Sequence, residues 1–80
     1  MDRDKILEAL QEIFRDMLDD DDFILDPDLK RADLPEWDSL FHITLTASAA
    51  DEFGVKISSN DIVNIKSIDA LIDVIEKGLK

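Results

Sequence analysis

Apolar side chains recur in the first part of the chain at intervals of three and four residues. The positions that follow this spacing are Ile6, Leu7, Leu10, Ile13, Phe14, Met17 and Leu18. Because an α-helix completes a turn about every 3.6 residues, this spacing places all of them on one face of a helix. The pattern predicts a helix over residues 3–18, with Asp2 and Asp4 at the end where the helix dipole favours negative charge.

The segment from Asp19 to Trp37 shows no such periodicity. It exceeds the roughly 12–15 residues beyond which structureless loops are uncommon in compact domains, so we expect it to pack onto the helices. The apolar residues available to hold it down are Phe23, Ile24, Leu25, Leu29 and Leu34. Pro27 and Pro35 disfavour regular helix inside it.

Four consecutive aspartates, residues 19–22, open this segment. A calcium loop of the EF-hand kind needs alternating ligands, a central glycine and a final glutamate, whereas this segment contains no glycine. We therefore interpret the run as solvated charge rather than as a metal site.

The second helix is predicted to begin at Asp38 or Ser39 and to end at Phe53. Gly54 follows, and glycine readily adopts the left-handed conformation that ends many helices. A turn of about 100° per residue gives this helix two apolar stripes. One consists of Leu45, Ala49 and Phe53, and the other of Leu40, Ile43, Ala47 and Ala50. A small core needs one stripe, so the other is a candidate docking face, unless the long segment or the third helix covers it.

Residues 57–64 predict a short third helix, in which Ser58 stands three residues before an acid, as in a capping box. A fourth helix is expected to start at Ser67 and to carry Lys77 and Lys80 near its end. Its apolar face consists of Ile68, Leu71, Ile72, Ile75 and Leu79. No stretch alternates as a strand would. The predicted fold is all-α: a four-helix bundle with a long loop between helices one and two and a short third helix.

Length and composition narrow the classes of function. The 80 residues support a single domain, residues 1–80, with little room for a deep catalytic cleft. The net charge of −11 and the absence of any basic run longer than Lys30-Arg31 disfavour nucleic acid and favour basic protein surfaces as partners. The chain has no cysteine and hence no thiol of its own. No secretory signal or membrane span is evident, and we expect a cytoplasmic monomer.

Ser39 lies where the second helix is predicted to begin. Asp38 can accept hydrogen bonds from the free amides of the first turn, which leaves the Ser39 hydroxyl facing outward. A phosphate ester at Ser39 would meet unpaired N–H groups and the positive end of the helix dipole. Trp37, the residue before the cap, can brace the turn in the manner of a hydrophobic staple. The position therefore suits an anion.

The DSL triplet of residues 38–40, the long loop before it and the FGVKI stretch of residues 53–57 together resemble the acyl and peptidyl carrier protein family. The similarity extends over residues 6–75. It implies that a separate phosphopantetheinyl transferase moves 4′-phosphopantetheine from coenzyme A to the Ser39 hydroxyl. Asp38 would help to position the transferase's magnesium ion and the coenzyme A phosphates. The thiol of the arm would carry acyl, aminoacyl or ketide groups as thioesters between enzymes.

The resemblance also implies a surface for partner enzymes. Family positions that contact partners correspond to Leu40, Ile43 and Ala47, which all belong to the second stripe. The implied partners are the transferase and the enzymes that load and use acyl groups, with basic or apolar docking surfaces.

Two departures from the fatty-acid carriers bear on the pathway. Many of them have glycine two residues before the aspartate, where this chain has Glu36, and several glutamates along the second helix, where it has only Asp51 and Glu52. The Trp-Asp-Ser-Leu form, followed by Phe41 and His42, is similar to carriers of specialised polyketide, peptide or modified-lipid pathways. Fatty-acid synthesis is the alternative. The initial methionine and the full set of helices favour a free carrier over an excised piece of a synthase.

Two rival interpretations belong to other classes of function. An enzyme would combine Asp38, Ser39 and His42 into a hydrolytic triad, but adjacent residues at a helix start cannot flank the imidazole as a triad requires. We expect His42 to be a partly exposed helix residue instead. The second rival is an unmodified helical adaptor that docks through the second stripe and in which Ser39 is only part of a cap.

Overall fold

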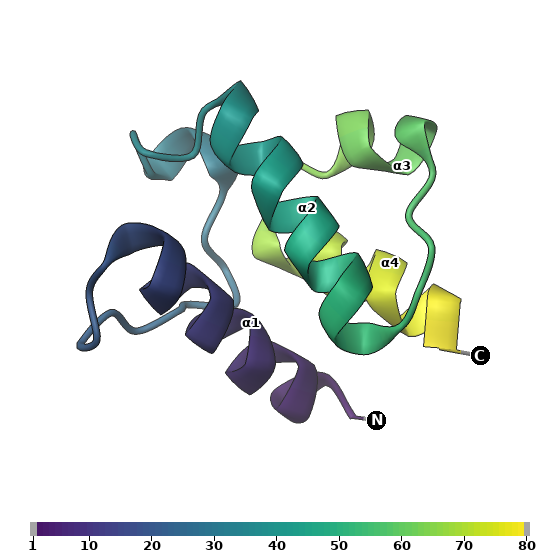
Figure 1. The fold of residues 1–80 in the computed structure, drawn as a ribbon, viewed down its shortest axis with the longest axis horizontal. Helices are drawn as coiled ribbons and strands as arrows, with labels where there is room; N and C mark the ends of the chain where they lie inside the picture. The colour runs from purple at the N-terminus through teal and green to yellow at the C-terminus, as the bar shows by residue number, and fades with distance from the viewer. Residues whose placement is uncertain (1, 80) are drawn as a thin grey trace.

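The computed structural model describes residues 2–79. The helices are α1 (Arg3–Leu18), α2 (Ser39–Phe53), α3 (Ser59–Asn64) and α4 (Ile68–Leu79), with a short 3₁₀ helix, η1 (Arg31–Asp33), between α1 and α2 (Figure 1). The all-α prediction, with a long loop and a short third helix, is confirmed. No helix within residues 2–79 is long and apolar enough to cross a membrane.

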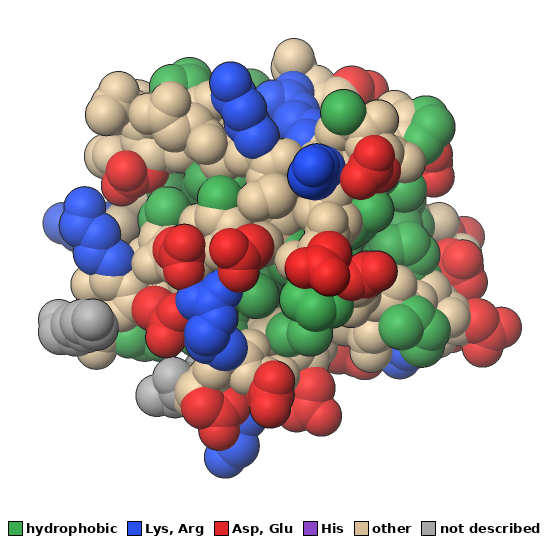
Figure 2. Space-filling model, turned by 180° about the vertical axis from the view of Figure 1, so that it is seen from behind, with side chains coloured by type: hydrophobic (Ala, Val, Ile, Leu, Met, Phe, Trp, Pro, Cys, Tyr) green, Lys and Arg blue, Asp and Glu red, His purple; other side chains and the backbone are tan. Residues whose placement is uncertain are grey.

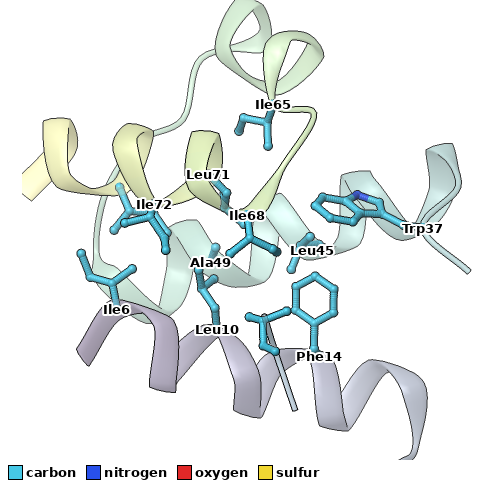
Figure 3. Close-up of a cluster of buried hydrophobic side chains, with 12 residues drawn as sticks. Ile6, Leu10, Phe14, Trp37, Leu45, Ala49, Ile65, Ile68, Leu71 and Ile72 are labelled. Carbon is cyan, nitrogen blue, oxygen red and sulfur yellow. The ribbon is translucent and has the colours of Figure 1, made fainter. Parts of the chain in front are cut away.

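The core lies where α1, α2 and α4 pack against one another, while α3 lies at the edge beside the first half of α2 (Figure 1). Each of the three long helices contributes one apolar stripe, and Figure 3 shows these side chains converging. The core residues in these helices are Ile6, Leu10, Phe14, Leu45, Ala49, Ile68, Leu71, Ile72 and Ile75. The stripes predicted for the first and last helices therefore face the core, except that Leu79, the last residue of α4, is 40% exposed and does not belong to it.

The helix boundaries follow the local capping residues. Asp2 accepts a hydrogen bond from the Lys5 amide (2.9 Å) and begins α1 at the predicted residue. Gly54 ends α2 with a φ of 65°, in the left-handed region that favours glycine. The third and fourth helices start two residues and one residue later than predicted, because Ser58 and Ser67 are caps that accept from amides three residues on. The predicted position of Lys80 lies outside the described residues.

The long segment is packed onto the helices, as predicted, except at Ile24. The Arg15 Nε donates to the Phe23 carbonyl (2.7 Å), and the Leu25 amide donates to the Gln11 side chain (2.9 Å). The expectation that Ile24 helps to hold the segment was wrong, because its side chain is 72% exposed. In extended chain, neighbouring side chains point to opposite sides, so the inward Phe23 and Leu25 turn Ile24 outward.

The second half of the segment is joined to the start of α4, a contact that the sequence did not predict. The Arg31 amide donates to the Lys66 carbonyl (2.8 Å), and the Ile68 amide donates to the Leu29 carbonyl (2.9 Å). These bonds make an isolated antiparallel bridge between Lys30 and Ser67. The segment that leads into α2 is therefore held in place by hydrogen bonds as well as by apolar contacts.

Ion pairs join the start of α1 to the outer side of α4. Arg3 donates to Asp73 (2.7 Å), to Glu76 and to Asp69. The hydrogen bond to Asp73, and after it the one to Glu76, raises the pKa of Arg3 above its ordinary value. Figure 2 shows acidic side chains over the middle and lower part of the face seen from behind, with a group of basic side chains in its upper part and others among the acidic ones below.

Candidate functional site

Ser39 is the first residue of α2 and its side chain is exposed. Asp38 caps the helix: its Oδ1 accepts from the Phe41 amide (2.8 Å), and its carbonyl accepts from the His42 amide (2.9 Å). Within residues 2–79, nothing accepts from the amides of Ser39 and Leu40. The predicted arrangement is confirmed: an outward hydroxyl beside unpaired N–H groups at the positive end of a helix.

His42 is not the partly exposed residue that the sequence led us to expect, since its side chain is only 4% exposed. The Trp37 Nε1 donates to the His42 Nδ1 (2.8 Å), and the His42 Nε2 lies 2.7 Å from the Ile62 carbonyl oxygen. An indole N–H can only donate, so Nδ1 is the acceptor and Nε2 carries the proton that is donated to Ile62. His42 therefore links the turn before α2 to α3.

Trp37 braces the start of α2, as predicted, but it does so through a hydrogen bond as well as through packing. Trp37 precedes the cap and meets His42, the fourth residue of α2, which is the spacing of a hydrophobic staple. The contact combines a hydrogen bond with ring packing, at 5.9 Å between ring centroids. The other side of Trp37 packs edge-on against Phe14 of α1. The start of α2 is therefore fixed to the core.

The same contacts exclude a hydrolytic triad. Both ring nitrogens of His42 are bonded, one to Trp37 and the other to Ile62. A general base needs a free nitrogen within hydrogen-bond reach of the nucleophile. Asp38 is engaged with the Phe41 amide rather than with the imidazole. Neither His42 nor Asp38 is therefore placed to activate Ser39.

The second stripe of α2 lies mostly uncovered. Leu40 and Ile43 are 75% and 61% exposed, and Ala47 is also exposed. The alternative, that the long segment or the third helix covers this stripe, is wrong. Val63 of α3, which is 65% exposed, adds to the apolar surface at this end of the molecule. No pattern in the sequence points to Val63, because a helix of six residues is too short to show an apolar periodicity.

A hollow of about 220 Å³ adjoins Ser39, between the first turns of α2 and the end of α3. Its lining residues are Arg31, Ser39, His42, Ile43, Ile62 and Val63. A second hollow, of about 500 Å³, is lined by Lys30, Arg31, Ala32, Trp37 and Lys66. Arg31 borders both. The only sequence signal for Arg31 was its place in the Lys30-Arg31 pair.

The run of four aspartates does not form a metal site in the structure. No group of three or more His, Cys, Asp or Glu side chains within residues 2–79 is placed to hold a metal ion. The Asp20 carboxylate instead accepts a hydrogen bond from the Asp22 amide (3.0 Å), which shapes the turn after α1.

Known proteins resemble this chain over nearly its whole length. It is 30% identical to the acyl carrier protein of Micrococcus luteus over 92% of this chain and 91% of that protein. It is also 30% identical to the acyl carrier protein of Myxococcus xanthus, over 91% and 92% of the two chains. No protein-family model matches the chain.

Solved structures agree with these relatives. The solution structure of a holo acyl carrier protein from Geobacter metallireducens superimposes with a TM-score of 0.80 at 32% identity, covering 92% of this chain and 85% of that one. The crystal structure of an acyl carrier protein from Thermotoga maritima gives 0.82 at 28% identity, covering 99% and 92%. Proteins of this kind are carriers and not enzymes, in agreement with the bonded state of His42. The chain belongs to the acyl carrier protein family.

Proposed function

We propose that Ser39 carries a covalent 4′-phosphopantetheine arm and that this arm holds acyl, ketide or aminoacyl groups. The observation that carries this proposal is the exposed Ser39 hydroxyl on the first turn of α2, beside amides without an acceptor in the described chain. The surroundings fit the group, because the adjoining hollow is open and Arg31 supplies a positive charge at its border. The chain has no cysteine, so the arm's thiol, once attached, supplies the thioester chemistry.

In this proposal a transferase performs the attachment, because His42 and Asp38, the candidate activating residues beside Ser39, are both engaged elsewhere. The Ser39 Oγ forms a bond to the phosphorus nearer to pantetheine in coenzyme A, while the bond from that phosphorus to the bridging anhydride oxygen breaks. Adenosine 3′,5′-bisphosphate leaves, and a base of the transferase takes the Oγ proton. The free amides at the start of α2 stabilise the phosphodiester that results.

The first prediction separates Ser39 from other hydroxyls. Incubation with coenzyme A, magnesium and a broad-specificity phosphopantetheinyl transferase is expected to add one phosphopantetheinyl group to the wild type and none to Ser39→Ala. Ser59→Ala is a matched control, since Ser59 is the exposed first residue of α3. It should be modified like the wild type. Intact mass is the readout, and an unmodified wild type would favour the adaptor.

Asp38 has two roles that substitution can separate. It caps α2, and we propose that its carboxylate also helps to position the transferase's magnesium ion and the coenzyme A phosphates. Asparagine is as good a cap as aspartate but carries no charge. Asp38→Asn is therefore expected to keep the free energy of unfolding within about 0.5 kcal/mol and to slow modification by at least tenfold, whereas Asp38→Ala should also lose about 1 kcal/mol. Rates of mass increase and urea unfolding measure the two effects. Modification of Asp38→Asn at the wild-type rate would remove the second role.

The partner face in this proposal consists of Leu40, Ile43 and Ala47. Their exposure next to Ser39 supports docking by enzymes that load or use the arm, with apolar surfaces at this point. Partners with basic surfaces are favoured by the net charge of −11. The first turn of α2 contains no acidic residue after Asp38. The acidic side chains that attract a basic partner therefore lie around the partner face and not within it.

We favour a specialised polyketide, peptide or modified-lipid pathway over fatty-acid synthesis. The support is Glu36 in place of glycine and the Trp37 that precedes Asp38. The Trp37–His42 pair is part of the fold of this site, so the Trp-Asp-Ser-Leu form also has a structural role. We further propose that the chain works as one cytoplasmic, monomeric carrier domain.

A further inference from the structure

Arg31 is held beside the start of α2 by its own hydrogen bonds. Its amide donates to the Lys66 carbonyl (2.8 Å), and its Nε donates to the Trp37 carbonyl (3.3 Å). Trp37 is two residues before Ser39, so the second bond brings the guanidinium to the turn that presents Ser39. Arg31 and Ser39 line the same hollow of about 220 Å³.

The end of this guanidinium is unpaired in the described chain. The other two arginines form ion pairs, Arg3 with three carboxylates of α4 and Arg15 with Glu12. Arg31 forms no ion pair within residues 2–79, and its only side-chain bond is the one from Nε to the Trp37 carbonyl. Two nitrogens, Nη1 and Nη2, therefore have no acceptor within residues 2–79, and the residue that carries them lines the hollow.

We propose that Arg31 binds the phosphodiester that joins the arm to Ser39, an inference that rests on the proposed attachment at Ser39. A phosphodiester carries one negative charge and two non-bridging oxygens. The planar guanidinium fork matches two such oxygens, and this pairing is among the stronger hydrogen-bonded contacts in proteins. Lys30 and Lys66 line only the second hollow and are not part of the contact.

The contact would offset negative charge that lies beside Ser39. Glu36 and Asp38, just before Ser39, are both acidic and exposed, so a new negative group at Ser39 lies close to negative charge. Arg31 offsets that repulsion locally. It also fixes the root of the arm beside α3, while the thiol end stays free to reach partner enzymes.

The test compares holo proteins by nuclear magnetic resonance. Wild type, Arg31→Gln, Arg31→Lys and Lys66→Gln are loaded with the arm, and intact mass verifies one group on each. The ³¹P resonance of the phosphodiester gives its chemical shift and line width, and the ¹⁵N resonance of the Arg31 Nε is followed from apo to holo protein. Lys66→Gln is the matched control, because it removes one positive charge that does not border the Ser39 hollow.

In wild type and Lys66→Gln, we expect the Arg31 Nε resonance to move on loading and the ³¹P line to be broad. Arg31→Gln should shift and narrow the ³¹P line, because the phosphate is then released from the fork. Arg31→Lys keeps the positive charge but lacks the planar guanidinium fork. Its ³¹P chemical shift and line width should therefore lie between those of the wild type and those of Arg31→Gln. If Arg31→Gln does not fold, the Arg31 Nε resonance of the wild type, followed from apo to holo protein, still decides whether Arg31 meets the phosphate.

Two results overturn the inference and are distinguishable. If all loaded variants give the wild-type ³¹P resonance and the Nε resonance does not move, Arg31 does not contact the phosphate, although the attachment at Ser39 stands. If the wild type gains no group, the attachment fails together with the role of Arg31.

Discussion

Replacing Phe14 with alanine is expected to lower the free energy of unfolding by about 3–5 kcal/mol. Phe14 is fully buried, and its ring packs against the rings of Phe23, Trp37 and Phe41 at centroid distances of 5.9, 5.6 and 5.6 Å. One ring therefore joins α1, the long segment and the start of α2, and Figure 3 shows two of these rings, Phe14 and Trp37. A domain of this length has about 4–12 kcal/mol of total stability, so the loss is a large part of it.

Urea unfolding followed by circular dichroism measures this loss. Phe14→Leu is the graded control, since it keeps most of the apolar volume and should cost clearly less than alanine. If Phe14→Ala is unfolded without urea, the leucine variant still reports the direction and size of the effect. A loss below about 1 kcal/mol in Phe14→Ala would show that the aromatic cluster does not hold the segment.

Replacing His42 with alanine is expected to cost about 2–5 kcal/mol. It leaves the buried indole N–H of Trp37 without its acceptor, which costs about 1–3 kcal/mol, and it removes the packing of a buried ring. The part-buried carbonyl of Ile62 loses its bond to His42 (2.7 Å) and keeps the longer one from the Ile65 amide (3.4 Å). The loss should also loosen α3, since His42 provides its hydrogen bond to α2.

Two measurements separate this effect from a general loss of helix. Urea unfolding gives the free energy, and the Trp37 indole proton resonance reports the hydrogen bond directly. Ile43→Ala is the neighbouring control: its side chain is 61% exposed, and its cost should stay within about 0.5 kcal/mol. Equal stability of His42→Ala and Ile43→Ala, with an unchanged indole resonance, would contradict the structural role of His42.

The parts of the fold that the sequence predicted are those set by nearby residues. The bounds of α1 and α2 follow from apolar spacing and from caps at Asp2, Asp38 and Gly54, all of which act within a few residues. The outward position of Ser39 depends on the same local cap. Helix existence and the place of Ser39 could therefore be predicted from the sequence alone.

The features that the sequence did not predict depend on distant partners. The burial of His42 requires Trp37 on one side and Ile62, twenty residues later, on the other. The place of Arg31 depends on the carbonyl of Lys66, which lies just before α4 and is far from Arg31 along the chain. Contacts between residues this far apart in the sequence leave no periodic pattern in it. A lone histidine or a pair of basic residues does not by itself indicate a structural role.

The attachment of the arm is tested most directly by fragmentation mass spectrometry of the wild-type protein after incubation with coenzyme A, magnesium and a phosphopantetheinyl transferase. The expected result is one phosphopantetheinyl group, located on the peptide at Ser39. A protein that remains at its original mass, or one that carries the group at Ser48 or Ser59, would contradict the proposed carrier site.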